Sequence, residues 1–379
     1  MSVTNQINHP TPYYEYDLNV LKNTLQRAKA AADKHGFHVH YALKANTDHR
    51  VLAAVLNNGF GADCVSGQEV KCALDSGFKS ENIAFAGVGK TDTEIDFAIE
   101  NELFTLNVES LEELEVIAER AKMLGKSANI ALRLNPDVNA KTHHYITTGL
   151  EENKFGIGEW QLAAVLDVIR ANELLHLRGL HFHIGSQITS LEPFKNLCSR
   201  ISYFIEFLLT HGFHIQHINA GGGLGINYDA EPNAADPDFE SYFQLFADQL
   251  QLKPDQELHF ELGRSLVAHC GSLMSRVLYV KKGQKTNFLI LDAGMTELIR
   301  PALYQAYHRI ENLSATTTEL EKYDVVGPVC ESSDCFGKAI MLPESKRGDI
   351  IAIRAAGAYG EAMASHYNLR KLNESVYLG

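Results

Sequence analysis

The sequence lacks the features that would direct a chain to a membrane. Residues 1–12 hold neither a basic stretch nor an apolar stretch of the kind found in signal peptides, and no run of about 18 consecutive apolar residues occurs. Positive charge is also scarce, because 34 Lys and Arg residues face 47 Asp and Glu residues, a formal net charge of −13. We therefore expect a cytoplasmic protein, with neither a nucleic acid nor an anionic membrane as its main partner.

Paired cysteines are also missing. The six cysteines form no CxxC pair, and in a chain of 379 residues they do not resemble a disulfide framework. Most are expected to be small buried hydrophobic residues. Internal repeats and low-complexity segments are absent too, which leaves a globular chain of two or three domains at about 150 residues per domain.

What the sequence does contain is a regular alternation of short β-rich runs with longer helical stretches between residues 37 and 264. Such alternation is typical of βα units around a parallel sheet, and eight units close a barrel. The expected strands are residues 37–43, 61–66, 82–86, 103–108, 129–134, 179–184, 215–220 and 257–262. Residues 109–124 carry helical periodicity, and Gly125 is a plausible stop.

After residue 264 the strand-like runs follow one another with no comparable helix between most of them. They are residues 273–280, 287–291, 323–329, 338–342 and 349–355. The run 13–18 also reads as a strand, although it precedes the barrel. The predicted fold is therefore α/β, with a (β/α)8 TIM-like barrel over residues 20–265 and a β-sandwich or barrel-like domain over residues 1–19 and 266–379.

Reactive residues gather at the expected C-terminal ends of the strands, where barrels carry their chemistry. They are Lys44, Asp63, His181, His183, Ser186, Gly221, Gly222, Gly223, Glu261, Gly263 and Arg264. Alone, the glycines could form a tight turn or cradle a phosphate, and Lys44 could be a surface lysine or a Schiff-base nucleophile. Together, a lysine, an anion cradle and a carboxylate are the parts of a pyridoxal phosphate site.

A metal centre is the competing interpretation of the histidines. His181 and His183 would point to the same side of a strand, and with Glu261 they could ligate zinc or iron. His143 and His144, in the long loop after the fifth strand, add to that possibility. No HExxH motif accompanies them.

The chain resembles the group IV, alanine-racemase-fold decarboxylases of basic amino acids along nearly its whole length. The matching segments are 41–46 (YALKAN), 133–138, 141–145, 148–149, 153–156 (NKFG), 181–187 (HFHIGSQ), 221–226 (GGGLGI), 261–264 (ELGR), 292–304 (DAGMTELIRPALY), 327–334 (GPVCESSD) and 357–368 (GAYGEAMASHYN). The resemblance implies pyridoxal 5′-phosphate as cofactor and, most closely, decarboxylation of meso-2,6-diaminopimelate to L-lysine and CO2 in lysine biosynthesis.

The resemblance also implies roles for single residues. Lys44 would carry the cofactor, Asp63 would position that amine, His183 would stack on the ring, and Glu261 would pair with the pyridine nitrogen. Phosphate contacts would come from Ser186, the three glycines, Gly263, Arg264 and Tyr359. The alanine racemases of this fold use arginine where this chain has Glu261, which favours decarboxylation.

Residues of the second domain, together with Arg264 of the barrel, would complete the site. By resemblance, Arg264, Arg300, Tyr304 and Tyr359 hold the substrate, Cys330 gives a proton to the decarboxylated carbon and Glu331 meets the distal amine. The GPVCESSD loop would enter the neighbouring subunit, which implies a homodimer with shared active sites and an intersubunit ion pair between Lys154 and Asp334. The alternatives are a decarboxylase of ornithine, arginine or carboxynorspermidine, an inactive cofactor-binding regulator, and a metal hydrolase.

Overall fold

The chain divides into two compact units in the computed structural model, which describes residues 9–138, 154–231 and 234–379. One unit comprises Leu25–Ile226 and Pro237–Leu266. The other comprises Met1–Thr24, Asn227–Asp236 and Val267–Gly379. The segment Asn227–Asp236 thus belongs with the C-terminal unit although it lies between two barrel elements in the sequence.

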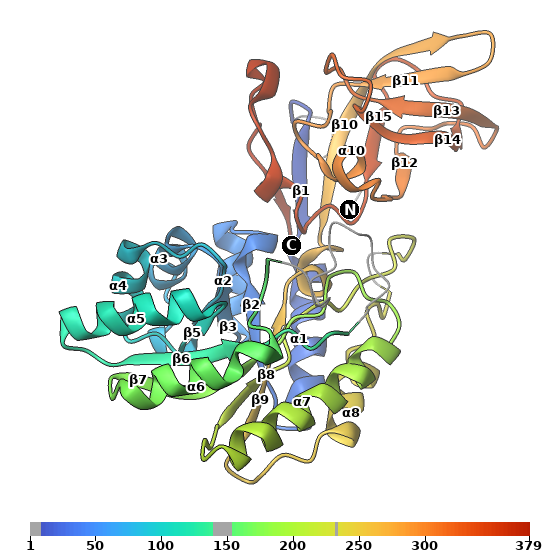
Figure 1. Cartoon of the computed structure of the whole chain (residues 1–379). Coiled ribbons are helices and arrows are strands. Elements are labelled where there is room, and N and C mark those ends of the chain that lie inside the picture. The colour runs from blue at the N-terminus through green and yellow to red at the C-terminus, as the bar shows by residue number, and fades with distance from the viewer. Residues whose placement is uncertain (1–8, 139–153, 232–233) are drawn as a thin grey trace. The chain divides into compact units, whose positions relative to one another are not determined.

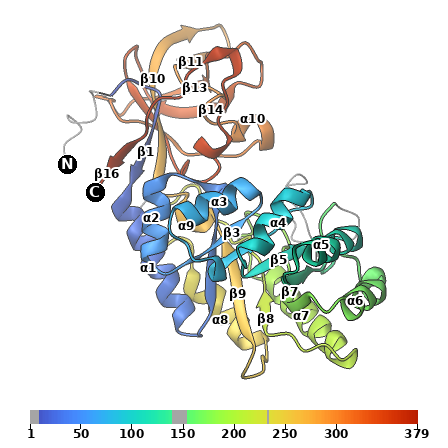
Figure 2. The same cartoon turned by 90° about the vertical axis from the view of Figure 1, so that its left-hand side faces the viewer.

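The first unit is a closed barrel of eight parallel strands, which confirms the predicted TIM-like barrel. Helices surround the strands on the outside (Figures 1 and 2). The strands are β2 (His38–Ala42), β3 (Gly61–Cys64), β4 (Ile83–Phe85), β5 (Thr105–Val108), β6 (Ala128–Arg133), β7 (Leu175–His181), β8 (His217–Asn219) and β9 (Glu257–Leu262). Most of their residues are buried, as expected of parallel strands covered on both faces.

The barrel helices begin and end at residues that the sequence marks clearly. In α5 (Leu111–Leu124), Ser110 accepts the backbone N–H of Glu113, and Gly125 ends the helix at a φ of 63°. The other helices are α1 (Leu18–Asp33), α2 (His49–Asn57), α3 (Gly67–Asp75), α4 (Asp92–Glu100), α6 (Leu162–Ala171), α7 (Glu192–Thr210), α8 (Phe239–Gln249) and α9 (Arg264–Val267). In the described parts of the chain, no helix is long and apolar enough to span a membrane.

An aromatic cluster fixes α8 against the last barrel strand. The Phe260 ring lies 4.8 Å from the ring of Phe246 and 5.0 Å from that of Phe243, both in near-perpendicular geometry. All three side chains are fully buried. Edge-to-face pairs of this kind add about 0.5–1.5 kcal/mol each beyond burial. Strand β9, which carries Glu261, is thereby held in place.

Strand β7 differs from its prediction, because it runs over Leu175–His181 where residues 179–184 were expected. Its first half alternates between buried and exposed side chains, so it lacks the apolar run that marked the other strands. The chain leaves the strand geometry after His181, although Phe182 N still donates to Asn219 O at 2.8 Å.

The second unit is β-rich, as predicted, and its main sheet has the strand order β12-β15-β10-β11-β13-β14. The N-terminal strand β1 (Tyr13–Asp17) pairs antiparallel with β10, and β16 (Val376–Leu378) pairs with β1 (Figure 2). The remaining elements are β10 (Gly271–Lys282), β11 (Asn287–Leu291), α10 (Arg300–Tyr304), β12 (Ile310–Asn312), β13 (Leu320–Val326), β14 (Cys335–Pro343) and β15 (Ile350–Ile353).

Candidate active site

The first two barrel strands bring Lys44 and Asp63 together. Lys44 lies in the 3-10 helix Leu43–Ala45, directly after β2, and Asp63 lies on the neighbouring strand β3. Lys44 Nζ is 3.6 Å from Asp63 Oδ2. The lysine side chain is 39% exposed and the aspartate side chain 1%, so an accessible amine is held next to a buried carboxyl group.

The surroundings of Asp63 disfavour the ionised form of its side chain. Burial raises its pKa well above the ordinary value, the negative charge of Glu261 raises it further, and the positive charge of Lys44 opposes both. Neither carboxyl oxygen has a hydrogen-bond partner among the residues that the structure describes. Since a buried acceptor without hydrogen bonds is costly, the Lys44 amine is its main compensation.

Glu261, at the end of β9, is held by a set of side chains from other strands. Its Oε2 lies 2.8 Å from His181 Nε2, and its Oε1 accepts from Asn219 Nδ2 at 2.7 Å and from Asn107 Nδ2 at 3.4 Å. Burial alone would raise the pKa of Glu261, but the charge and hydrogen bond of His181 and the charge of Lys44 lower it to about 2. The buried carboxylate is therefore ionised.

His183 and the glycines that follow β8 are joined by a hydrogen bond. The backbone N–H of Gly222 donates to His183 Nδ1 at 3.3 Å. Burial lowers the pKa of His183 well below its ordinary value, and the charges of Lys44 and Arg133 add to this effect. The ring is therefore neutral, with its proton on Nε2.

The glycines at 221–223 are required by close backbone contacts. A Cβ atom on Gly221 would lie 2.0 Å from Phe182 O, and one on Gly222 would lie 1.9 Å from Glu261 O. The N–H of Gly221 is already used, because it donates to Asn219 Oδ1 at 2.8 Å. The segment thus packs against both neighbouring strand ends and is more than a simple turn.

Arg264 and Ser186 meet at the same mouth of the barrel. Arg264 is the first residue of α9 and is only 7% exposed, and its Nη2 donates to Ser186 Oγ at 3.0 Å. Gly263 separates Arg264 from β9, and its carbonyl accepts the N–H of Leu266. A buried guanidinium beside a hydroxyl is a suitable site for a phosphate or a carboxylate.

Sequence reasoning missed a buried ion pair at this mouth. Arg133, the last residue of β6, lies with its Nη1 2.6 Å from Glu109 Oε1, and the two side chains are 8% and 2% exposed. Glu109 also accepts the backbone N–H groups of Gly87 at 2.9 Å and Gly156 at 3.1 Å. Glu109 directly follows one predicted strand and Arg133 is the penultimate residue of another, so their positions at strand ends were the available clue.

In the second unit, Arg300 is held by its own neighbours. It begins α10, is 5% exposed, and its Nη1 lies 2.9 Å from His308 Nε2. His308 Nδ1 lies 2.8 Å from Arg354 O, so Nδ1 carries the ring proton and Nε2 accepts from the guanidinium. The guanidinium also lies 5.3 Å from the centre of the Tyr228 ring. Tyr304, which ends α10, is partly buried.

The GPVCESSD segment presents two predicted site residues at the surface of its unit. Cys330 and Glu331 are both exposed, and Glu331 Oε1 accepts from the Tyr367 hydroxyl at 2.8 Å. Tyr359, which is partly buried, adopts a φ of 57°. A tyrosine in this left-handed region is uncommon.

Asp334, in the GPVCESSD segment, is hydrogen-bonded to the backbone of its own unit. It is 4% exposed, and its carboxylate accepts the backbone N–H groups of Met295 and Val329, both at 2.7 Å. These hydrogen bonds hold the loop in shape, and the ion pair with Lys154 across subunits stays a prediction.

The histidines of the barrel mouth do not converge as metal ligands. His181 contacts Glu261, whereas His183 accepts from Gly222, and among the described residues His181, His183 and Glu261 do not form a cluster of possible ligands for one ion. His143 and His144 lie outside the described residues, as do the motif segments 141–145 and 148–149.

Comparisons with known proteins agree with this site. A family model described as pyridoxal-dependent decarboxylase, pyridoxal binding domain, matches residues 18–268. The diaminopimelate decarboxylase of Bacteroides thetaiotaomicron is 54% identical over 363 residues, which cover 96% of this chain and 94% of the relative. The crystal structure of the Helicobacter pylori diaminopimelate decarboxylase complexed with L-lysine is 41% identical, with a TM-score of 0.92, over 99% of this chain and 93% of that one.

A more distant structure shares the fold alone. The lysine/ornithine decarboxylase of Vibrio vulnificus, complexed with putrescine, is 21% identical with a TM-score of 0.84, over 98% of this chain and 95% of that one. Fold and site together define a pyridoxal-phosphate-dependent decarboxylase built on an eight-stranded barrel. The chain belongs to the diaminopimelate decarboxylase family. The predicted cofactor and enzyme class are thereby confirmed.

Proposed function

We propose that this protein converts meso-2,6-diaminopimelate to L-lysine and CO2, the last step of lysine biosynthesis. Family membership supports the reaction, and the L-lysine complex of the Helicobacter pylori relative contains what would be its product. The observation that carries the proposal is the assembly of Lys44, Asp63, His183 and Glu261 at one mouth of the barrel.

The residues at this mouth fit pyridoxal 5′-phosphate. The Lys44 amine is accessible, the buried Asp63 beside it is poised to position that amine, and Glu261 offers an ionised carboxylate. When bound, the cofactor supplies an electron sink for the pair of electrons that CO2 leaves behind. We assign its binding to Lys44, His183, Ser186, Gly221, Gly222, Gly223, Glu261, Gly263, Arg264 and Tyr359.

Glu261 would keep a proton on the pyridine nitrogen. A carboxylate with a pKa of about 2 remains ionised throughout the neutral range, and it therefore favours the protonated form of a nitrogen next to it. His181 and Asn219 fix both carboxylate oxygens, so the charge is oriented before substrate arrives. The neutral ring of His183 would offer a flat face for stacking without adding a competing positive charge.

The substrate's carboxylates would meet arginine side chains. Arg264 and Arg300 are both buried, and an arginine fork binds a carboxylate with two parallel hydrogen bonds. Because His308 already orients the Arg300 side chain, that side chain would lose less conformational freedom when it binds a carboxylate. We assign Arg264, Arg300, Tyr304 and Tyr359 to the substrate, with the exposed Glu331 for the distal amine.

Cys330 would complete the reaction. The carbon–carbon bond to the departing carboxylate breaks, its electrons stay with the substrate, and the Cys330 Sγ–H proton forms the new carbon–hydrogen bond. The resulting thiolate regains a proton from solvent. The exposure of Cys330 and Glu331 supports the further proposal that the GPVCESSD loop serves the partner's site in a homodimer with shared active sites.

A decarboxylase of another basic amino acid is the alternative. The buried Arg300 favours a second carboxylate, which ornithine and arginine lack at that end. Comparing turnover of diaminopimelate, ornithine, arginine and carboxynorspermidine decides between the two.

Borohydride reduction of the holoenzyme followed by peptide mapping tests the assignment of the cofactor lysine. We expect the label on Lys44, and its loss in Lys44→Ala. Lys71→Ala is the matched control, because Lys71 is an exposed lysine paired with Asp75. A label on any lysine other than Lys44 would overturn the assignment.

A further inference from the structure

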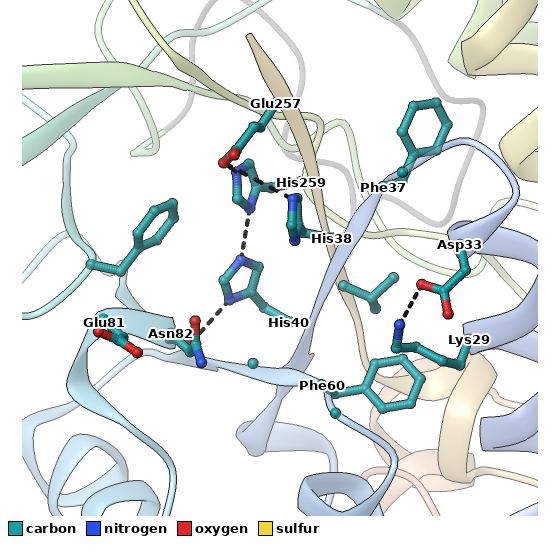
Figure 3. A pocket seen from close by; sticks show the side chains of 15 residues that line it. Lys29, Asp33, Phe37, His38, His40, Phe60, Glu81, Asn82, Glu257 and His259 are labelled. Carbon is teal, nitrogen blue, oxygen red and sulfur yellow. Dashed lines mark hydrogen bonds and ion pairs between the residues drawn. The ribbon is translucent and has the colours of Figure 1, made fainter. Parts of the chain in front are cut away.

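The opposite mouth of the barrel, at the N-terminal ends of the strands, holds a second cluster of polar side chains. A cavity of about 330 Å³ opens there, lined by residues that include His38, His40, Asn82, Glu257 and His259 (Figure 3). None of these residues takes part in the proposed decarboxylation.

Strand alternation explains how the cluster forms. Glu257, His259 and Glu261 occupy alternate positions of β9, so their side chains point to the same side. His217 pairs with Glu257, and Asn219 pairs with His259, on the parallel strand β8. The pattern that brings Asn219 and Glu261 to the active site therefore brings His217, Glu257 and His259 together at the other end.

Three possible ligand atoms meet in this cluster. His217 Nδ1 lies 3.2 Å from Glu257 Oε2 and 3.3 Å from His259 Nε2, and His259 Nε2 lies 3.6 Å from Glu257 Oε2. Ligand atoms of a tetrahedral ion at about 2.0–2.1 Å are about 3.3–3.4 Å apart. The triangle has the dimensions of one face of such a site without any movement of the side chains.

The hydrogen bonds around the cluster determine which nitrogen carries a lone pair. His40 Nδ1 lies 3.1 Å from the carbonyl of Asn82, which can only accept, so this nitrogen carries the proton. His40 Nε2 must then accept from His259 Nδ1, at 3.0 Å. His259 Nε2 therefore points a lone pair toward His217 and Glu257.

His217 Nδ1 thus lies beside two acceptors, His259 Nε2 and Glu257 Oε2. Either one proton on His217 Nδ1 is shared by both acceptors or a cation binds all three atoms. Two imidazoles, a carboxylate and one open position form a ligand set that Zn2+ commonly takes.

We propose that His217 Nδ1, His259 Nε2 and the Glu257 carboxylate form a Zn2+ site, with water as the fourth ligand and His40 as the partner that orients His259. Metal-bound histidines generally donate their other N–H to a hydrogen-bond acceptor, usually a carboxylate, a backbone carbonyl or water, and here His40 Nε2 has that role. The Glu257 side chain is 51% exposed, which gives an ion access, and the Phe104 ring packs against the rings of His40, His217 and His259. The ion would join β8 to β9.

Calorimetric titration of the metal-stripped holoenzyme with Zn2+ tests the proposal. We expect one ion per chain, and affinity at least about tenfold weaker in Glu257→Gln and in His217→Ala, since even the loss of an outer partner costs tenfold or more. Glu257 is exposed, so Glu257→Gln should fold normally, which an unchanged circular dichroism spectrum would verify. Co2+ bound in place of Zn2+ should show the visible absorption of a tetrahedral site. The absence of a thiolate charge-transfer band would distinguish binding at this site from binding to cysteine side chains.

His214→Ala is the matched control, because His214 and Asp255 form an exposed histidine–carboxylate pair in the segments that precede β8 and β9. Zn2+ affinity should be unchanged in that variant. The proposal fails if the wild-type protein does not bind Zn2+, if His214→Ala weakens binding as much as His217→Ala, or if neither ligand variant weakens it. Decarboxylase activity does not enter the readout, so failure here would leave the proposed reaction untouched.

Discussion

The side-chain amide of Asn219 donates from Nδ2 to Oε1 of Glu261 at 2.7 Å. Its other end accepts the backbone N–H of Gly221 at 2.8 Å, so one residue links the buried carboxylate to the glycine segment. A shift of Gly221 would therefore move Asn219, and a shift of Asn219 would disturb the carboxylate of Glu261. Asn219 is thus a positioning residue for Glu261.

Asn219→Ala should lower kcat by about 10- to 100-fold, because hydrogen bonds to charged groups contribute about 1.5–3 kcal/mol. Without the Asn219 amide, Glu261 Oε1 keeps only the longer contact to Asn107. The KM for substrate should change little, and steady-state kinetics of the holoenzyme give both values. Asn129→Ala is the control, since Asn129 donates to a backbone carbonyl away from this site. Equal losses in both variants would contradict the positioning role.

Asp63→Asn should make the cofactor-free protein more stable at neutral pH while lowering its activity. The raised pKa of Asp63 means that its ionised form is costly in the folded state. That penalty is complete above the folded-state pKa and disappears below the unfolded value of about 3.9. The advantage of the variant in thermal unfolding should therefore shrink as the pH falls.

The exposed Asp75 provides the comparison for that measurement, because Asp75→Asn removes a carboxylate that pairs with Lys71 in solvent. Its unfolding midpoint should follow that of the wild-type protein across the same pH range. A destabilised Asp63→Asn protein at neutral pH would show that Asp63 contributes more through its pairing with Lys44 than it costs through burial.

Gly222→Ala should destabilise the barrel by about 3 kcal/mol, the upper end of the cost of overpacking, and should impair cofactor binding. The added Cβ would lie 1.9 Å from a backbone oxygen, that of Glu261, which cannot rotate away. Gly89→Ala is the control for the change from glycine to alanine, because a Cβ atom added at Gly89 would have no other atom within 4 Å. Chemical denaturation with cofactor fluorescence measures both effects, and near-identical stability of the two variants would refute the explanation.

Cys330→Ala should lose most of its turnover and keep its cofactor. The side chain is exposed in its unit, so its removal leaves no buried cavity and the unfolding midpoint should not move. Absorbance of the bound cofactor and the kcat of the same preparation provide the two readouts. Cys72→Ala, which removes a partly buried thiol from α3, should retain activity. Loss of cofactor from Cys330→Ala would point to a structural role instead.

The sequence predicted those parts of the fold that local patterns determine. Residues 257–262 and 287–291 were expected as strands and are β9 and β11, because each is a short run with many apolar or β-branched side chains. The contacts of Glu261 with His181, Asn219 and Asn107 could not be predicted, since they join strands distant in sequence and depend on the barrel's register.

Burial and contacts between distant strand ends could not be predicted from the sequence. No local pattern showed that the Asp334 carboxylate is buried and accepts two backbone N–H groups of its own unit, and the ion pair between subunits stays a prediction. The Arg133–Glu109 pair was missed because each residue looks ordinary until the strand ends meet. By contrast, Lys44 and Asp63 were expected together, and they are, since β2 and β3 are neighbours in both sequence and barrel.

The central claim is the decarboxylation of meso-diaminopimelate. Its most direct test is incubation of the purified holoenzyme with that compound, with measurement of released CO2 and chiral identification of the amino acid formed. The account predicts L-lysine and CO2 in equal amounts, with little turnover of ornithine or arginine. Faster turnover of ornithine or arginine than of diaminopimelate, or no CO2 from any of the three, would contradict it.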